Sequence, residues 1–274
     1  NKPTIYWSEL TFNNGTPVWS NPEIVITSAQ PDELSQLTIE LLNGQPAIFW
    51  TETQPTSYAE LTLGENPVLY YRLSETNGPI LENIGSWGSA GNGTYSAGVQ
   101  LNQIGALEDP TTKSGDPNRA AKFEAGTSAS INNAIQIYRD SFTIDFWFKF
   151  DETPTASNPI TLVNLSDVAQ ISFTGEALEL ALGNANSNTS INSSTSTNNP
   201  SFIKDQWYYV TAVYDATAQT AGLFINGEKV GILENLDLFQ PGSRPVSTIQ
   251  LADENNQTGV YLDEVAYYTS ALSF

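Results

Sequence analysis

Alternation of apolar and polar positions is the clearest pattern in the chain. Similar alternating or aromatic runs at 142–150, 207–214, 223–230 and 260–268 are separated by turn residues, which is typical of strands rather than helices. The first run places every second side chain on one face of a strand, and these are Phe142, Ile144, Phe146, Phe148 and Phe150. We expect residues 62–274 to form an all-β, two-sheet antiparallel sandwich of jelly-roll type, with Phe146 buried in a central strand.

A repeat occupies the N-terminal part of the chain. Residues 3–9 (PTIYWSE) return in altered form at residues 46–52 (PAIFWTE), an interval of 43 residues. An interval in the low forties is typical of a four-stranded β-propeller blade. We therefore predict that residues 1–58 form a four-stranded antiparallel blade-like unit, with strands at 17–26, 36–42 and 47–51 after the first copy. Because one repeat cannot bury both its faces, and because methionine is absent, we expect a piece of a longer array.

Three segments depart from the strand pattern. Residues 32–37 and 134–140 favour short helical turns. The run 183–200 (GNANSNTSINSSTSTNNP) is poor in apolar residues and is expected to be an exposed loop.

Composition excludes several kinds of chemistry. The chain has no histidine and no cysteine, so common zinc sites, Ser-His or Cys-His nucleophiles and disulfides are ruled out. A net charge of −20 disfavours nucleic acid and anionic membrane surfaces as partners, and no apolar run is long enough to cross a membrane. A cysteine-free chain rich in Asn, Ser, Thr and Gly fits a bacterial secreted or surface protein.

Several short motifs follow one another in a characteristic order. Residues 66–78 (NPVLYYRLSETNG) precede a Gly-rich loop at 83–95 (NIGSWGSAGNGTY), and the strand motifs FTIDFW at 142–147 and WYYV at 207–210 come later. The motifs AAKF at 120–123, Asn-Gly at 226–227 and LDEV at 262–265 complete the series. In this order, over about three quarters of the chain, they resemble laminin-G-like jelly-roll domains of the concanavalin A-like lectin/glucanase superfamily.

This resemblance raises the question of catalysis, since the superfamily includes glucanases. Retaining glucanases of this fold resemble one another in a Glu-x-Asp-x-(x-)Glu strand, which supplies two carboxyl groups about 5–5.5 Å apart. The chain contains no such triplet. Adjacent strand residues point to opposite faces, so Asp263 and Glu264 are not expected to act on one bond. We therefore predict that the chain is not an enzyme.

The resemblance also implies a calcium ion near the opening loop, beside the last strand. The side chains that could provide oxygen ligands are Glu75, Asn83, Asn92 and Asp263, and carbonyl groups of the Gly-rich loop would complete the shell. The alternative is that Glu75 and Asp263 only accept hydrogen bonds from backbone N–H groups at strand ends.

Tryptophan is the residue type most suited to stacking on sugars. Trp87 lies in the Gly/Ser loop and is the candidate ligand-binding residue, whereas Trp147 and Trp207 lie on strands and are expected to pack in the core. Trp7, Trp19 and Trp50 are expected to pack within the blade-like unit.

Two functional hypotheses follow. In the first, the chain is an extracellular recognition or adhesion module that binds a glycan or another surface polymer. In the second, it is a structural part of a cell-surface layer, filament or adhesin stalk, whose partners are neighbouring copies or domains. Both hypotheses expect an extracellular or cell-surface location, no nucleic acid and no direct membrane insertion.

Overall fold

The chain divides into two compact units, Asn1–Glu60 and Leu61–Phe274. The structure, a computed structural model, describes residues 4–273 except 8–9, 14–15, 22, 28–33, 43–44, 53–56, 108–117, 133–140, 167, 184–188 and 237–247. No helix in these described ranges is long and apolar enough to span a bilayer.

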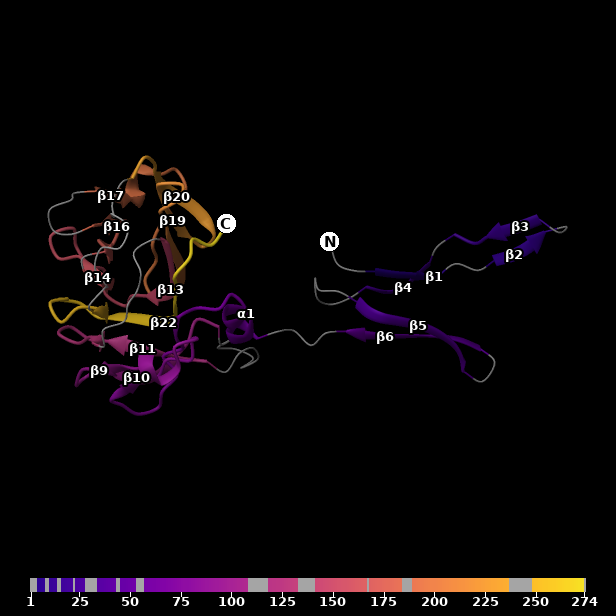
Figure 1. Ribbon diagram of the computed structural model, residues 1–274, viewed down its shortest axis with the longest axis horizontal. Coiled ribbons are helices and arrows are strands. Elements are labelled where there is room, and N and C mark those ends of the chain that lie inside the picture. The colour runs from indigo at the N-terminus through magenta and orange to yellow at the C-terminus, as the bar shows by residue number, and fades with distance from the viewer. Residues whose placement is uncertain are drawn as a thin grey trace. The chain divides into compact units, whose positions relative to one another are not determined.

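The second unit is a sandwich of two eight-stranded sheets whose strand pairs are all antiparallel in the described ranges (Figure 1). The first sheet, here called the β13 sheet, runs in the order β10 (Gln100–Ile104), β11 (Arg119–Phe123), β22 (Val260–Tyr268), β13 (Ser141–Lys149), β18 (Tyr208–Asp215), β19 (Thr220–Ile225) and β20 (Glu228–Leu233), and β7 (Leu69–Tyr71) also pairs with β22. The second, the β14 sheet, runs in the order β17 (Thr189–Asn192), β16 (Leu178–Leu182), β15 (Ala169–Phe173), β14 (Ile160–Leu165), β21 (Ile249–Leu251), β12 (Ala129–Ile131), β9 (Gly93–Tyr95) and β8 (Ile80–Leu81). The predicted jelly-roll sandwich is confirmed.

The apolar face of β13 lies in the core, as its alternation predicts. The five alternate side chains from Phe142 to Phe150, the last of which directly follows the strand, are at most 1% exposed. β13 pairs with β18 on one edge and with β22 on the other. The two sheets meet through aromatic rings: the ring centres of Phe148 on β13 and Phe173 on β15 are 5.2 Å apart. Phe146 is therefore both central and fully buried, as predicted.

The opposite face of β13 is covered at one end only. Near its start the hydroxyl of Thr143 donates to the Ser270 carbonyl and accepts from the Leu272 N–H, at 2.9 Å in both cases, so the C-terminal segment crosses the strand there. Towards its end Trp147 and Lys149 are only half-buried. Trp147 and Trp207 are not members of the core, so the prediction that they pack there is wrong. For Trp147, alternation places it on the face opposite the phenylalanines.

The first unit contains three two-stranded antiparallel ladders. β1 (Thr4–Trp7) pairs with β4 (Glu23–Thr27), β2 (Leu10–Asn13) with β3 (Thr16–Trp19), and β5 (Leu34–Leu42) with β6 (Gln45–Glu52). Among the described residues these strands pair two by two rather than in one four-stranded sheet, and two of the three ladders are hairpins across short turns. β2 with β3 and β5 with β6 flank the Asn-Gly pairs at 14–15 and 43–44, which favour hairpins. The blade assignment itself, and the packing of Trp7, Trp19 and Trp50, whose side chains lie outside the described ones, stay predictions.

Local structure corrects two smaller expectations and leaves a third untested. The described part of the predicted helical turn at 32–37 is strand, because β5 forms a long ladder with β6, whereas residues 134–140 lie outside the described ranges. The predicted loop at 183–200 contains β17 and the 3-10 turn η2 (Ser193–Thr195), because Ile191 is buried and the backbone pairs with β16.

The helix α1 (Tyr58–Gly64) was not expected from the sequence. Its start has a capping box, in which the Glu60 N–H donates to the Ser57 hydroxyl at 3.2 Å and the Glu60 carboxylate accepts from the Ser57 N–H at 3.0 Å. This Ser-x-x-Glu spacing is a recognised helix-start signal, so the helix could have been predicted.

Candidate functional site

A pair of carboxylates on the last strand lies side by side. In a regular strand Asp263 and Glu264 would point to opposite faces, but Glu264 has a φ of +49° and the β13–β22 register shifts between Asp145 and Trp147. As a result the amide nitrogen of Asn118 lies 2.8 Å from an oxygen of each carboxylate. The expectation that they point apart is wrong because this irregularity, like a β-bulge, re-aims one side chain.

Asp263 is completely buried. Its Oδ2 accepts the backbone N–H of Ala106 at 2.7 Å, and both its oxygens lie 2.8 Å from the Asn118 amide nitrogen. Burial, followed by the negative charge of Glu264, raises the pKa of Asp263 well above its usual range. Asn118 is itself 1% exposed, and its side-chain carbonyl oxygen has no hydrogen-bond partner among the residues that the structure describes.

Glu264 is also buried and is held by three neighbouring side chains, those of Asn118, Arg72 and Tyr70. The guanidinium of Arg72 donates to Oε1 from Nε at 3.0 Å and from Nη2 at 2.9 Å, and the hydroxyl of Tyr70 donates to Oε2. Burial raises the pKa of Glu264, and the hydrogen bonds of Tyr70 and Arg72 act in the opposite direction. The carboxylate pair is thus an enclosed structural cluster that joins β7, the segment before β11 and β22.

Asn83 organises the opening loop. Its Oδ1 accepts the backbone N–H groups of Tyr70 at 2.7 Å and Gly85 at 3.0 Å, and its amide donates to the Gly88 carbonyl at 2.9 Å. Its own N–H donates to Oδ1 of Asn92 at 2.9 Å. The structure therefore brings Asn83 and Asn92 together around the turn that contains η1 (Gly88–Gly91).

Glu75 lies in a separate set of contacts. Its carboxylate accepts the N–H of Glu82 at 2.7 Å and the hydroxyl of Tyr95 at 2.8 Å. The hydrogen bonds of the four predicted calcium ligands described above thus form three groups, around Glu75, around Asn83 with Asn92, and around Asp263. Across the described ranges no three acidic side chains gather as a metal site would require. Calcium at this loop stays a prediction.

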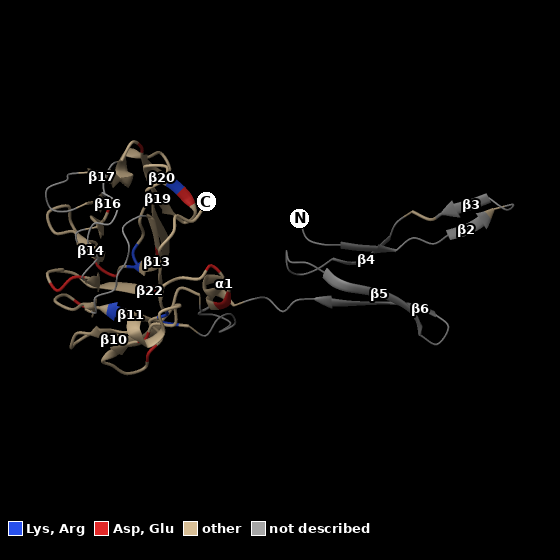
Figure 2. Ribbon diagram, viewed as in Figure 1, with Lys and Arg blue, Asp and Glu red and all other residues tan. Residues whose placement is uncertain are grey.

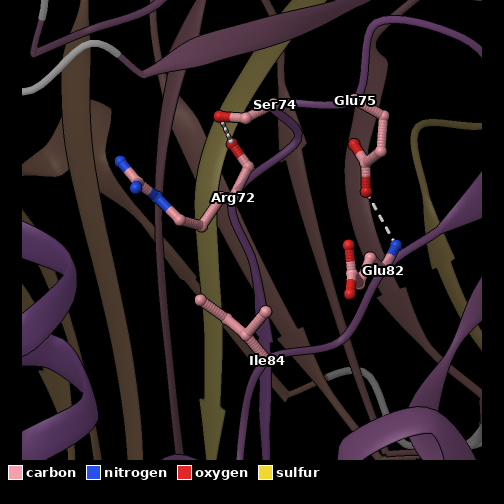
Figure 3. Close-up of a pocket in the computed structure, with 5 residues that line it drawn as sticks. All are labelled: Arg72, Ser74, Glu75, Glu82 and Ile84. Carbon is pink, nitrogen blue, oxygen red and sulfur yellow. Dashed lines mark hydrogen bonds between the residues drawn. The ribbon is translucent and has the colours of Figure 1, made fainter.

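A small hollow opens beside these contacts. It has a volume of about 180 Å³ and is lined by Arg72, Ser74, Glu75, Glu82 and Ile84. Figure 3 shows the guanidinium of Arg72 pointing away from the two glutamates, in keeping with its bonds to Glu264. Ser74 is anchored by the Arg119 backbone, whose N–H it accepts at 3.0 Å. Glu82 and Ile84 are exposed.

The hollow offers hydrogen-bond acceptors next to one apolar wall. Its volume is below the roughly 300–1,000 Å³ of pockets that hold drug-sized ligands, so it suits a group of the size of one sugar ring. Arg72 and Glu82 were not identified from the sequence. Arg72 lies in the motif at 66–78, but nothing in a single sequence distinguishes it or Asn118 from other polar residues.

Trp87 lies at the start of η1 and is half-buried. Its side chain packs against the hydrophobic core, and its backbone N–H donates to the Val68 carbonyl at 3.2 Å. Only part of the ring therefore faces solvent, and its role in ligand binding stays a prediction.

Two eight-stranded sheets with a shared aromatic core, and a loop-built hollow at their rim, define a lectin-type β-sandwich. The chain belongs to the concanavalin A-like lectin/glucanases superfamily, because the superfamily's laminin-G-type model matches residues 123–273. No curated protein matches the chain.

Solved structures similar to this chain include binding domains of botulinum neurotoxins. The serotype D binding domain is 20% identical with a TM-score of 0.58, and the match covers 77% of this chain and 50% of that one. The serotype D ligand-binding domain in complex with N-acetylneuraminic acid is 17% identical with a TM-score of 0.58, over 78% and 50%. The type G receptor-binding domain is 17% identical with a TM-score of 0.55, over 76% and 49%. The chain thus spans about half the length of these structures, and at such identities the likeness shows the fold alone.

Proposed function

We propose that the chain is a non-catalytic recognition module of a larger secreted or surface protein, and that it binds a glycan through the hollow beside β7. The observation that carries this proposal is the lining of the hollow, where the glutamates Glu75 and Glu82 stand next to the apolar Ile84. Sugar hydroxyl groups donate hydrogen bonds to carboxylates, and the C–H faces of the ring pack against apolar side chains. The proposal places the protein outside the cell, on or near a bacterial surface.

Charge favours a neutral glycan over an acidic one. The chain carries a net charge of −20, and two glutamates line the hollow. An anionic polymer would be repelled both at long range and at the hollow itself. The guanidinium of Arg72 offers little compensation, because it is directed towards the buried Glu264.

The same contacts support a non-catalytic role. Glycoside hydrolysis needs two carboxyl groups that flank the scissile bond. Asp263 and Glu264 lie together but have no exposed surface, so no substrate reaches them. Each carboxylate oxygen of Glu75 accepts one hydrogen bond, from the Glu82 N–H or the Tyr95 hydroxyl. Each oxygen has a second lone pair, which is suited to accept a hydrogen bond from a bound sugar.

The structural alternative is supported by the first unit. Among its described residues each strand pairs on one edge only, in the three ladders given above. Such unpaired edges accept a strand from another chain. In this case the partners would be neighbouring copies in a surface layer, filament or stalk.

A glycan array, run with and without a chelator, tests the proposal. We expect binding to neutral glycans and no change in the bound glycan over time. Glu82→Gln removes the negative charge and replaces one of the two exposed acceptor oxygens by an NH2 donor, without touching a described side-chain contact. We expect it to weaken binding about tenfold, the loss of about one hydrogen bond of a charged group. Glu228→Gln makes the same change of charge on the β20 hairpin and should bind like the unmodified protein.

Two outcomes would contradict the proposal. Equal binding by the Glu82→Gln and Glu228→Gln variants would remove the hollow as the site. Absence of glycan binding, together with concentration-dependent association in analytical ultracentrifugation, would favour the structural alternative.

A further inference from the structure

Two aromatic and two basic side chains form a group on the outer face of the β13 sheet, away from the hollow. It consists of Trp207, Tyr261, Lys149 and Lys122 and is called the Trp207 platform below. The Nζ of Lys149 lies 4.9 Å from the ring centre of Trp207 and 4.3 Å from that of Tyr261. The Nζ of Lys122 lies 5.3 Å from the Tyr261 ring centre. The two aromatic rings stand nearly edge to face, with their centres 6.4 Å apart.

Strand register brings these residues together. Tyr261 on β22 is paired on one side with Lys149 of β13 and on the other with Lys122 of β11. Trp207 directly precedes β18, the other neighbour of β13. Figure 2 shows basic residues, Lys or Arg, in blue on β11 and beside β13. All four side chains are half-buried, and none of them belongs to the core or lines the hollow.

The charged groups of the platform differ in how they are paired. Lys122 makes ion pairs with Glu124 at 2.8 Å and Asp151 at 2.7 Å. Lys149 makes no ion pair among the described residues and rests on the two rings, and burial lowers its pKa. Cation–π contacts of this kind stabilise a lysine without using its N–H donors on a carboxylate.

The platform therefore combines the three features that a sugar ring requires. Aromatic surface is available for its C–H face, Lys149 offers donors to its oxygens, and Asp151 and Glu124, whose side chains are 27% and 37% exposed, offer acceptors to its hydroxyl groups. The two lysines and the two carboxylates of this face balance each other, and the net charge of −20 of the chain disfavours an acidic sugar. An apolar protein partner would have to desolvate four charged groups, which is costly.

We propose that the Trp207 platform is a second saccharide site, which takes one neutral pyranose unit by stacking on Trp207, with the nearly perpendicular ring of Tyr261 at the edge of the bound sugar. This proposal rests on the proposed function for the class of ligand only, because the platform shares no residue with the hollow. Two separate sites on one domain would let the module hold a single glycan chain at two points or bridge two chains.

The test follows the indole N–H signals of the isotope-labelled protein by NMR. The signal of Trp207 is assigned by its absence from the spectrum of the Trp207→Leu variant. The probes are the neutral hexasaccharides of cellulose, amylose and mannan, with hexagalacturonate as the acidic comparison. We expect at least one neutral probe to shift the Trp207 signal in a saturable way, and the shift to persist in Glu82→Gln.

Variants at position 207 give the affinity. We expect Trp207→Leu to weaken binding of that probe to the Glu82→Gln protein about tenfold, and Trp207→Phe, which keeps a ring, to weaken it less. Unchanged melting temperatures of both variants establish that the fold is retained, since the side chain lies outside the core.

The proposal is overturned if no neutral probe moves the Trp207 signal, or if only hexagalacturonate does. Loss of the Trp207 shift in Glu82→Gln would also overturn it, because the platform and the hollow would then be one site. If Glu82→Gln binds glycans as well as Glu228→Gln does while the Trp207 shift persists, the proposed function of the hollow is overturned and the platform remains a site.

Discussion

Single polar side chains hold the rim of this sandwich together, and Asn83 is the clearest case. Its side chain satisfies two buried backbone N–H groups, of Tyr70 and Gly85, and one carbonyl group. A change of Asn83 to Ala leaves these groups without partners, and each buried unsatisfied group costs about 1–3 kcal/mol. We expect Asn83→Ala to lower the free energy of urea unfolding by about 2–4 kcal/mol. The exposed Asn77→Ala is the control, and equal effects of the two variants would contradict this role.

Asp145 links stability to pH. It is 4% exposed, and burial raises its pKa to about 7, although the hydroxyl groups of Tyr209 and Tyr268 act against this and the charge of Glu264 adds to it. The folded protein therefore binds this proton more tightly than the unfolded chain does. We expect stability to fall as the pH rises from about 4 to about 7 and then to level off.

The variant Asp145→Asn, which imitates the protonated acid, tests this linkage. Its free energy of unfolding should vary less between pH 4.5 and pH 8 than that of the unmodified protein. Some dependence in the same direction should remain, because the pKa values of Asp263 and Glu264 are also raised. Parallel pH profiles for Asp145→Asn, the unmodified protein and the exposed Glu254→Gln control would show that Asp145 is not responsible.

Calcium is a further prediction at the residue scale. If the ion binds, it raises the stability by about 2.7 kcal/mol at a free concentration one hundred times its dissociation constant. Magnesium should substitute poorly, because it demands tighter octahedral coordination. We expect Asp263→Asn to remove most of the calcium increment in the melting temperature.

The increment is the quantity to compare, because the hydrogen bonds of Asp263 to Ala106 and Asn118 make the chelated variant less stable as well. A melting temperature that responds neither to calcium nor to chelator would end the calcium hypothesis. Asp263 would then be an acid that only accepts hydrogen bonds.

At the scale of single elements, the alternation along β13 is the sequence pattern that predicts the buried core most clearly. Phe146 is fully buried on a strand that pairs on both edges. Truncation to Ala leaves a cavity, and β13 cannot move to close it because the strand is hydrogen-bonded to a neighbour on each edge. We expect Phe146→Ala to lower the free energy of unfolding by about 3–5 kcal/mol in a denaturant titration. Ile232→Ala on β20, where the side chain is 49% exposed, should have little effect.

The other elements show where a periodic pattern is not enough. The helix α1 depends on the capping box of Ser57 and Glu60 rather than on a long apolar period. β17 lies in a stretch whose composition predicts a loop. Its one buried apolar side chain, Ile191, does not make a period that would predict a strand. The alternation of β13 places Trp147 on the outer face. The expectation of a core position was wrong because it relied on the resemblance to the family rather than on this alternation.

At the scale of the whole molecule, the two units are predicted to differ in independent stability. The second unit has an extensive core, in which some forty buried side chains of the described residues form one cluster. The first consists of two-stranded ladders, and isolated two-stranded hairpins are at best marginally stable in water. We expect a protein of residues 62–274 to fold alone and a peptide of residues 1–58 to be unfolded.

Amide NMR spectra of the two pieces check this expectation. Dispersed signals from the 1–58 peptide alone would contradict it and would show that this unit needs no partner. A collapsed spectrum from residues 62–274 would show that the sandwich depends on the first unit.

The sequence by itself determined the fold class, because period-two alternation in strands such as β13 dictates which side chains a sheet can bury. It also located the opening loop, since Gly-rich turns and the spacing of short motifs are local properties of the chain. Only the tertiary structure decided which polar groups meet. The register shift at Glu264 turns two adjacent acids onto Asn118, 145 and 146 residues away in the chain, and pairing of β11, β22 and β13 brings Lys122, Tyr261 and Lys149 together. Such contacts depend on strand register and irregularities, and a shift of one residue changes every neighbour.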